Sequence, residues 1–97
     1  MQFLLLAYDG ENKLAKRLEV RPQHLANLAN LANLPSDAHV ICAGGLLTEE
    51  GQMKGSAMVM DFPDRASLDD YLRTEPYVVA GVWEEITVEP MNVVISK

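Results

Sequence analysis

The alternation of apolar and polar residues predicts four strands along this chain. Each is a run rich in β-branched, aromatic or other apolar residues and bounded by turn residues. The predicted strands are Gln2–Tyr8, His39–Ala43, Gly55–Phe62 and Trp83–Ile95. The first is apolar at nearly every position, which indicates a central place in a sheet. Pro90 interrupts the last, which indicates a strand that is bulged or at a sheet edge for part of its length.

Two further patterns have helical spacing. Leucines recur every four residues in Asn12–Glu19, and a longer apolar stripe runs over Pro22–Leu34. Because Pro22 suits the first turn of a helix, we expect Val20 and Arg21 to separate two helices here. A later helix is expected over Arg65–Thr74, with Asp64 as its N-cap.

The resulting order, β-α-β-β-α-β, is typical of an α+β protein with the ferredoxin-like split βαβ arrangement. In it, an antiparallel sheet carries two helices on one face. A chain of 97 residues makes one compact domain over residues 1–97. The helices leave the other face of the sheet uncovered, and we expect something else to bury it. We expect a homodimer that buries this face, with the candidate residues Phe3, Leu5, Met58 and Met60.

Charge and cysteine content limit the partners and the classes of function that are expected for this protein. The formal net charge is −6, which argues against nucleic acid or an anionic membrane as partner but allows a small anionic ligand. The single cysteine, Cys42, excludes an intrachain disulfide and is expected to pack in the core. The apolar run after Met1 has no basic flank and is too short to span a bilayer, so a cytoplasmic location is expected.

His24 is the most informative candidate for chemistry. It shares the apolar face of its predicted helix with Leu28 and Leu31, in the first turn. It could be a core histidine bonded to a backbone carbonyl, or a general base at a pocket. Asp9, at the end of the first strand, is the predicted carboxylate partner, and Glu75 is the competing one; each could instead be a turn or solvated residue.

Other residues are candidates for ligand binding. Arg21 could bind an anion or form a surface ion pair, and Tyr77 could stack on an aromatic ligand or pack at a helix end. Gly44, followed by Gly45, could admit a ligand to the backbone or make a tight turn. Ser56 is a weaker candidate, because it is not surrounded by the Gly-x-Ser-x-Gly motif of a nucleophilic serine. Metal-ligand spacings and glycine-rich phosphate loops are absent from the sequence, so we expect no metal and no cofactor.

Several segments resemble the YciI-like, or YCII-related, family. They are Phe3–Asp9, Lys16–Leu25, Ala43–Gly45, Gly55–Ser56 and Glu75–Glu84. The resemblance implies a dimeric α+β barrel with a pocket around a histidine and an acidic partner. A characterised relative is a dehydrochlorinase of chlorinated hydroxyquinols that uses neither metal nor organic cofactor. Two positions depart from the family pattern: Glu75 replaces an aspartate, and Gly45 replaces a proline.

Residues and resemblance together predict a small cofactor-independent enzyme. His24 would abstract a proton and Asp9 would fix its tautomer, in an elimination or isomerisation of a small phenolic or enolisable molecule. Arg21, Gly44, Ser56, Glu75 and Tyr77 would bind this molecule. The alternative is a ligand-binding or regulatory dimer without catalysis, in which His24 only hydrogen-bonds the ligand.

Overall fold

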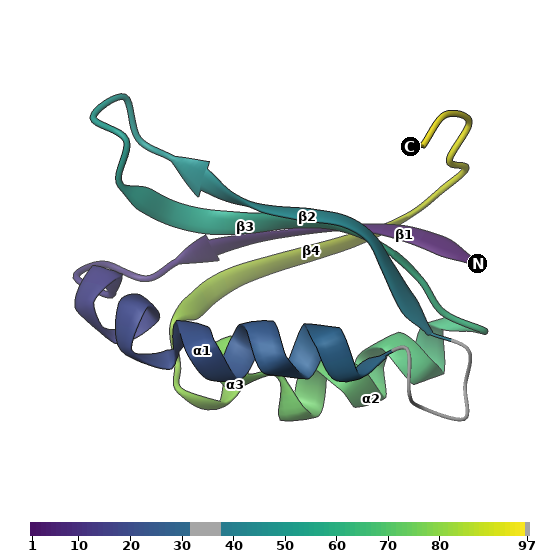
Figure 1. The fold of residues 1–97 in the computed structure, drawn as a ribbon, viewed down its shortest axis with the longest axis horizontal. Coiled ribbons are helices and arrows are strands. Elements are labelled where there is room, and N and C mark those ends of the chain that lie inside the picture. The colour runs from purple at the N-terminus through teal and green to yellow at the C-terminus, as the bar shows by residue number, and fades with distance from the viewer. Residues whose placement is uncertain (32–37, 97) are drawn as a thin grey trace.

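The computed structural model describes residues 1–31 and 38–96, and in this part of the chain a four-stranded antiparallel sheet carries three helices. The sheet order is β2-β3-β1-β4. The helices lie beneath one face of the sheet, as Figure 1 shows. The strands are β1 (Gln2–Asp9), β2 (His39–Leu47), β3 (Met53–Asp61) and β4 (Trp83–Met91), and the helices are α1 (Leu14–Asn30), α2 (Arg65–Thr74) and α3 (Pro76–Val79).

This architecture confirms the predicted ferredoxin-like α+β fold. β1 lies between β3 and β4, so the prediction of a central first strand is also confirmed. β4 is an edge strand, which is where Pro90 costs no internal ladder bond. None of the described helices is long and apolar enough to cross a membrane.

The sheet has one buried face and one open face. Phe3, Leu5 and Ala7 of β1 are buried, whereas the alternate residues Leu4 and Leu6 are partly exposed. Across the ladder, Phe3 pairs with Met60 and Leu5 with Met58, and all four belong to the core. The prediction that they form a subunit interface is therefore wrong. Period-2 alternation separates the two faces of a strand but does not say which one the helices cover.

The open face carries the opposite set of apolar residues. Leu4 pairs with Val59 and Leu6 with Ala57, so these four side chains share it. Cys42 of β2, which pairs with Val59, is exposed, and the expectation of a core cysteine is wrong. Figure 1 shows the hairpin between β2 and β3 and the C-terminal segment on this side of the sheet.

α1 is one continuous helix that contains Pro22, so the predicted break at Val20 and Arg21 is wrong. Proline inside a helix removes one backbone bond and costs about 3 kcal/mol. Here the first half of the helix is held by tertiary contacts of Arg17 with the sheet, which offset that cost. His24 therefore lies in the middle of a helix, not in a first turn. The helix ends at Asn30, and the predicted end at Leu34 lies outside the described residues.

α2 begins as predicted at Arg65. The side chain of Asp64 accepts a hydrogen bond of 2.8 Å from the backbone N–H of Ser67, which is an N-cap. These hydrogen bonds from Ser67 lower the pKa of Asp64 below its ordinary value. A lowered acidic pKa means that the cap stabilises the fold above the ordinary pKa and that this contribution is lost as the pH falls through the lowered pKa.

We therefore expect Asp64→Ala to lower the melting temperature at neutral pH, while Asp64→Asn, which keeps a cap oxygen, lowers it less. The difference between wild type and Asp64→Ala should shrink in acid, because protonation weakens the same acceptor. Thermal melts of the three proteins across the acidic range measure both effects. A difference that stays constant down to the lowest pH would contradict the capping role.

Candidate active site

The candidate site is built on one stripe of α1. Arg17, His24 and Leu31 are spaced by seven residues, so they point to the same side of the helix, and all three are buried. The first two are polar side chains on a face that otherwise packs against the sheet. Burial of such groups is costly unless each has a partner, and each has one.

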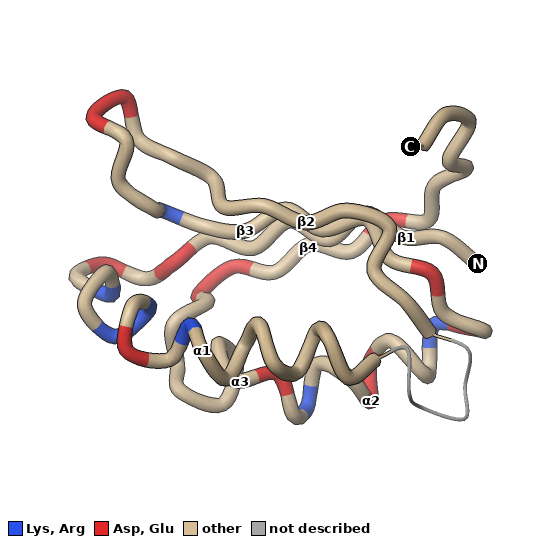
Figure 2. The backbone as a smooth tube through the Cα atoms, viewed as in Figure 1, with Lys and Arg blue, Asp and Glu red and all other residues tan. Residues whose placement is uncertain are grey.

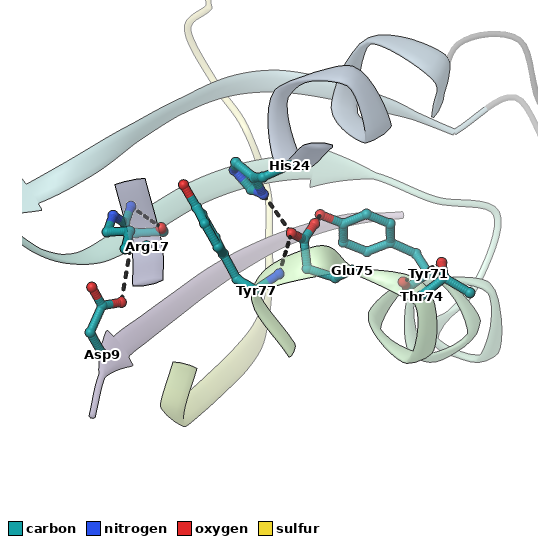
Figure 3. Close-up of polar contacts among 8 residues, drawn as sticks. Asp9, Arg17, His24, Tyr71, Thr74, Glu75 and Tyr77 are labelled. Carbon is teal, nitrogen blue, oxygen red and sulfur yellow. Dashed lines mark hydrogen bonds and ion pairs between the residues drawn. The ribbon is translucent and has the colours of Figure 1, made fainter. Parts of the chain in front are cut away.

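His24 is paired with a fully buried carboxylate. Its Nδ1 lies 2.5 Å from Oε1 of Glu75, whose exposed fraction is 0% (Figure 3). Glu75 joins α2 to α3 and caps α3, because its Oε1 also accepts the backbone N–H of Tyr77 at 3.1 Å. The Tyr71 hydroxyl of α2 donates to the other oxygen, Oε2. With Nδ1 directed at Glu75, Nε2 is the nitrogen of His24 that remains for a ligand.

Burial, with the neighbouring charge of Glu75, raises the pKa of Tyr71 well above its ordinary value. The phenol therefore keeps its proton and acts as a donor to Glu75. A carboxylate that accepts from a hydroxyl, a backbone N–H and an imidazole is fixed in position. This arrangement in turn orients the ring of His24, as a carboxylate does in other histidine–acid pairs.

Arg17 carries the second polar cluster. Its guanidinium donates to Oδ1 of Asp9 at 2.9 Å and to Oγ of Ser56 at 2.7 Å. Burial raises the pKa of Asp9, although the charge and hydrogen bond of Arg17 oppose that shift. The predicted pairing of Asp9 with His24 is wrong. Because α1 does not break at Pro22, Arg17 lies close to the end of β1 and pairs with Asp9. The carboxylate that pairs with His24 is Glu75.

Tyr77 separates the two clusters. Its ring stacks on the ring of His24, with centroids 4.2 Å apart and planes inclined by 21°. On its other side the guanidinium carbon of Arg17 lies 4.7 Å from the ring centroid, within the range of a cation–π contact. Figure 3 shows the Tyr77 hydroxyl between Arg17 and His24. Burial raises the pKa of this phenol, an effect that Arg17 and Arg21 partly oppose, so at neutral pH it is a donor.

These groups line a cavity of about 120 Å³ between α1, β2 and β3. Four predicted binding residues lie in its wall together with His24: Arg21, Gly44, Ser56 and Tyr77. Glu75 and Asp9 do not line the cavity, but each binds a residue that does: Glu75 contacts His24, and Asp9 contacts Arg17. The full lining is Arg17, Arg21, His24, Leu25, Leu28, Ala43, Gly44, Gly45, Met53, Ser56, Met58 and Tyr77.

The glycines of the wall lie inside β2, so the interpretation of Gly44 and Gly45 as a tight turn is wrong. At Gly45 a Cβ atom would collide with Sδ of Met53, whereas at Gly44 it would meet nothing within 4 Å. The absence of a side chain at Gly45 thus keeps room for Met53 beside Arg17.

The cavity is cationic in a protein of net negative charge. Two guanidinium groups belong to its wall, and the described lining residues include no carboxylate. Figure 2 shows basic residues near the start of α1, at this end of the molecule, with acidic residues among them. The two guanidinium groups in the cavity wall can attract an anion despite the overall charge.

Arg17 is the site residue that sequence reasoning missed. It lies seven positions before His24, a spacing that places both on one helical face. The expected break at Pro22 put the two residues on different helices and hid the relation. The seven-residue spacing of Arg17, His24 and Leu31, read as one continuous helix, was the signal that could have identified Arg17 as a site residue.

In the described part of the chain, no three His, Cys, Asp or Glu side chains lie close enough together to hold a metal ion. The polar groups that the cavity offers are an imidazole, two guanidiniums, a phenol and a hydroxyl. These are groups for binding an anion and for moving a proton.

The sheet order and the helices on a single face place this molecule among the ferredoxin-like α+β proteins. Within that class, the chain belongs to the YCII-related domain family, whose model matches residues 1–92. This confirms the family that its sequence motifs indicated.

Curated relatives cover almost the whole chain. Protein YciI of Escherichia coli O6:H1 is 30% identical over 98 residues, which is 95% of this chain and 97% of the relative. An uncharacterized protein of Haemophilus influenzae is 32% identical over the same shares.

A solved structure of similar fold is 5-chloro-2-hydroxyhydroquinone dehydrochlorinase from Burkholderia phenoliruptrix, in complex with 2,5-dihydroxybenzoquinone. Its TM-score is 0.81 at 24% identity, over 95% of this chain and 94% of that one. An antibiotic biosynthesis monooxygenase is more distant, with a TM-score of 0.57 at 14% identity over 97% and 98%. At these identities the two structures support the fold.

Proposed function

We propose that this protein is a small enzyme in which His24 acts as a general base on a small anionic or enolisable ring compound. The observation that carries the proposal is the 2.5 Å contact between Nδ1 of His24 and the fully buried Glu75, at the wall of a cavity that contains two arginines. The pair orients the imidazole, and the arginines supply the charge that a developing anion needs.

The proposed step is a proton transfer. Nε2 of His24 accepts a proton from a carbon or hydroxyl of the substrate, and the electron pair of that bond moves into the ring system. In an elimination, a leaving group such as chloride departs from the adjacent carbon with its own electron pair. In an isomerisation, the imidazolium returns the proton to a different carbon. Neither outcome changes the oxidation state of the protein.

The remaining wall residues would hold the anionic form of the substrate. Arg17 is kept in place by Asp9 and Ser56, and the Tyr77 hydroxyl lies between Arg17 and His24. An oxygen that gains negative charge here would meet a guanidinium and a phenol donor whose positions are already fixed. The cavity volume of about 120 Å³ suits a compound of one ring.

The compound 2,5-dihydroxybenzoquinone is a suitable first probe, because it is a single ring that is anionic at neutral pH and absorbs visible light. The dehydrochlorinase of similar fold is in complex with it. We expect saturable binding, followed as a change in the visible spectrum, and a loss of about tenfold in affinity in Arg21→Ala, which removes one of the two charges.

The matched control is Arg65→Ala, which removes an exposed arginine of α2 that pairs with Asp69. It should leave the affinity unchanged. Binding with wild-type affinity in Arg21→Ala would contradict the anionic-ligand assignment. Binding without any turnover would favour the alternative, a ligand-binding dimer in which His24 serves only as a hydrogen-bonding group.

We further propose that the protein is a homodimer formed through the open face of the sheet. Leu4, Leu6, Ala57 and Val59 form an apolar surface there, opposite the helices. Apolar surface of this kind on one sheet face is typical of a subunit interface. Two sheets of this kind can pack face to face, with their apolar side chains between them.

Light scattering at micromolar concentration should therefore give the mass of two chains. Leu6→Lys, at the centre of that face, should give a folded monomer, because a buried lysine without a partner opposes association. Leu47→Lys is the control, since Leu47 is exposed at the end of β2. A wild-type protein that is monomeric at this concentration would contradict the proposal.

A further inference from the structure

The wall of the cavity at His24 has fixed parts and movable parts. Arg17, Ser56 and Tyr77 are buried, and hydrogen bonds or ring stacking hold each of them to its neighbours. Met53, also in the wall, is different: it is the first residue of β3, it is only partly buried, and its side chain is a flexible thioether. The position of this side chain affects how far the cavity extends at its end.

The thioether of Met53 lies over a glycine, at the Arg17 end of the cavity. A Cβ atom on Gly45 would collide with Sδ of Met53 and lie 3.1 Å from its Cε, with Nη2 of Arg17 3.8 Å away. The thioether thus fills the space that a side chain at Gly45 would take. Gly45 pairs across the ladder with Ser56, which accepts a hydrogen bond of 2.7 Å from the same Nη2. The thioether and the guanidinium are therefore neighbours in the wall.

This arrangement constrains a ring that binds through an oxygen. Figure 3 shows Arg17 and His24 on opposite sides of the Tyr77 ring. An oxygen placed at Arg17 brings the adjacent ring position close to Met53, because the thioether and the guanidinium lie side by side. A hydrogen at that ring position takes little space, whereas a chlorine or a methyl group would meet the thioether in a cavity of only about 120 Å³.

We propose that Met53, packed over Gly45, is a specificity-determining residue of this cavity. It excludes rings that carry a substituent larger than hydrogen beside the oxygen at Arg17. A single substituent can be turned away from Met53 toward His24, where the elimination would need its leaving group, but substituents on both sides of the ring cannot. The inference rests on the proposed function for the class of ligand, a ring anion, and not on any reaction at His24.

The matched probes are 2,5-dihydroxybenzoquinone and its dichloro derivative, chloranilate. Both are flat rings that are anions at neutral pH and absorb visible light, and chlorine replaces hydrogen at each free ring position of the second. Every oxygen of chloranilate has a chlorine beside it, so turning the ring does not relieve the collision with Met53. We expect wild type to bind the unsubstituted ring at least about tenfold more tightly, as for an added methylene in a fitted pocket.

The substitution Met53→Ala should remove this preference. It should raise the affinity for chloranilate about tenfold and change the affinity for 2,5-dihydroxybenzoquinone by less than about threefold. Met91→Ala is the matched control, because it removes a partly exposed thioether of β4 that is not in the cavity wall. It should leave both affinities unchanged. Thermal melts show whether each variant is folded.

The substitution Gly45→Ala tests the packing of the thioether over the glycine. The added methyl group displaces Met53, so the ratio of the two affinities should change. In the Met53→Ala background, the methyl group would meet Arg17 only at an ordinary contact distance, so the same substitution should leave the ratio unchanged. The difference between the two backgrounds measures the coupling between the two positions. Equal effects in both backgrounds would contradict the packing role of Gly45.

Two further results would overturn the inference while the anionic-ligand assignment stands. One is equal affinity of wild type for the two rings, and the other is a preference for the unsubstituted ring that persists in Met53→Ala. The absence of saturable binding of either ring to wild type would overturn the inference together with that assignment. Because the size limit acts on binding, the preference should be retained in His24→Gln, whatever the rate of proton transfer.

Discussion

Replacing Arg17 by methionine should lower the free energy of unfolding by about 3 kcal/mol. Arg17 and Asp9 form an ion pair of 2.9 Å in which the two side chains are only 4% and 6% exposed. Methionine keeps most of the apolar stem but leaves the carboxylate of Asp9 buried without a cation. It also removes the donor to Ser56. Breaking a buried pair from one side is much more costly than replacing both members.

The control lies four residues further along the same helix. Arg21 is exposed, so Arg21→Met should change the free energy of unfolding by no more than about 0.5 kcal/mol. The double variant Asp9→Asn with Arg17→Met removes the stranded charge and should recover part of the loss. Denaturant unfolding of the four proteins measures these differences. Equal stability of Arg17→Met and Arg21→Met would contradict the buried ion pair.

The largest effect on activity is expected at His24. Gln can keep one hydrogen bond to Glu75 at similar size, so His24→Gln should retain the fold while it lowers proton-transfer rates by about 10²-fold or more. His24→Leu is different. It leaves Oε1 of Glu75 with only the backbone N–H of Tyr77, so it should destabilise the protein as well.

Thermal melts and single-turnover rates separate the two kinds of loss. A general base predicts that His24→Gln melts close to wild type and loses the rate. A histidine that only supports the fold predicts the reverse, a lower melting temperature with the rate retained. Tyr71→Phe, which removes one donor to Glu75 but leaves the His24 contact, should give a smaller loss of rate than His24→Gln.

The sequence predicted the topology because each strand and turn was encoded locally. The cap of α2 by Asp64 and the edge position of the Pro90 strand followed from side-chain and backbone chemistry at those positions. His24 on an apolar helical stripe was visible from spacing alone. Its place in a cavity wall, together with Arg21 and Tyr77, agrees with the predicted grouping.

What could not be predicted depended on contacts between distant segments. α1 continues through Pro22, where local propensity favoured a break, and Arg17 in its first half contacts Asp9 and Ser56 of the sheet. The choice of Glu75 over Asp9 as the partner of His24 follows from that continuity. Which face of β1 meets the helices is likewise set by packing, since both faces of the strand are apolar.

The role proposed for the His24–Glu75 pair is to move protons on a ring held by Arg17 and Arg21. Its most direct test is the incorporation of deuterium from D₂O into the ring C–H positions of 2,5-dihydroxybenzoquinone, followed by NMR with wild type, His24→Gln and buffer alone. We predict that wild type accelerates the exchange and that His24→Gln, which still binds the compound, is slower by about 10²-fold. Equal exchange rates in wild type and His24→Gln, with binding retained in both, would contradict the claim.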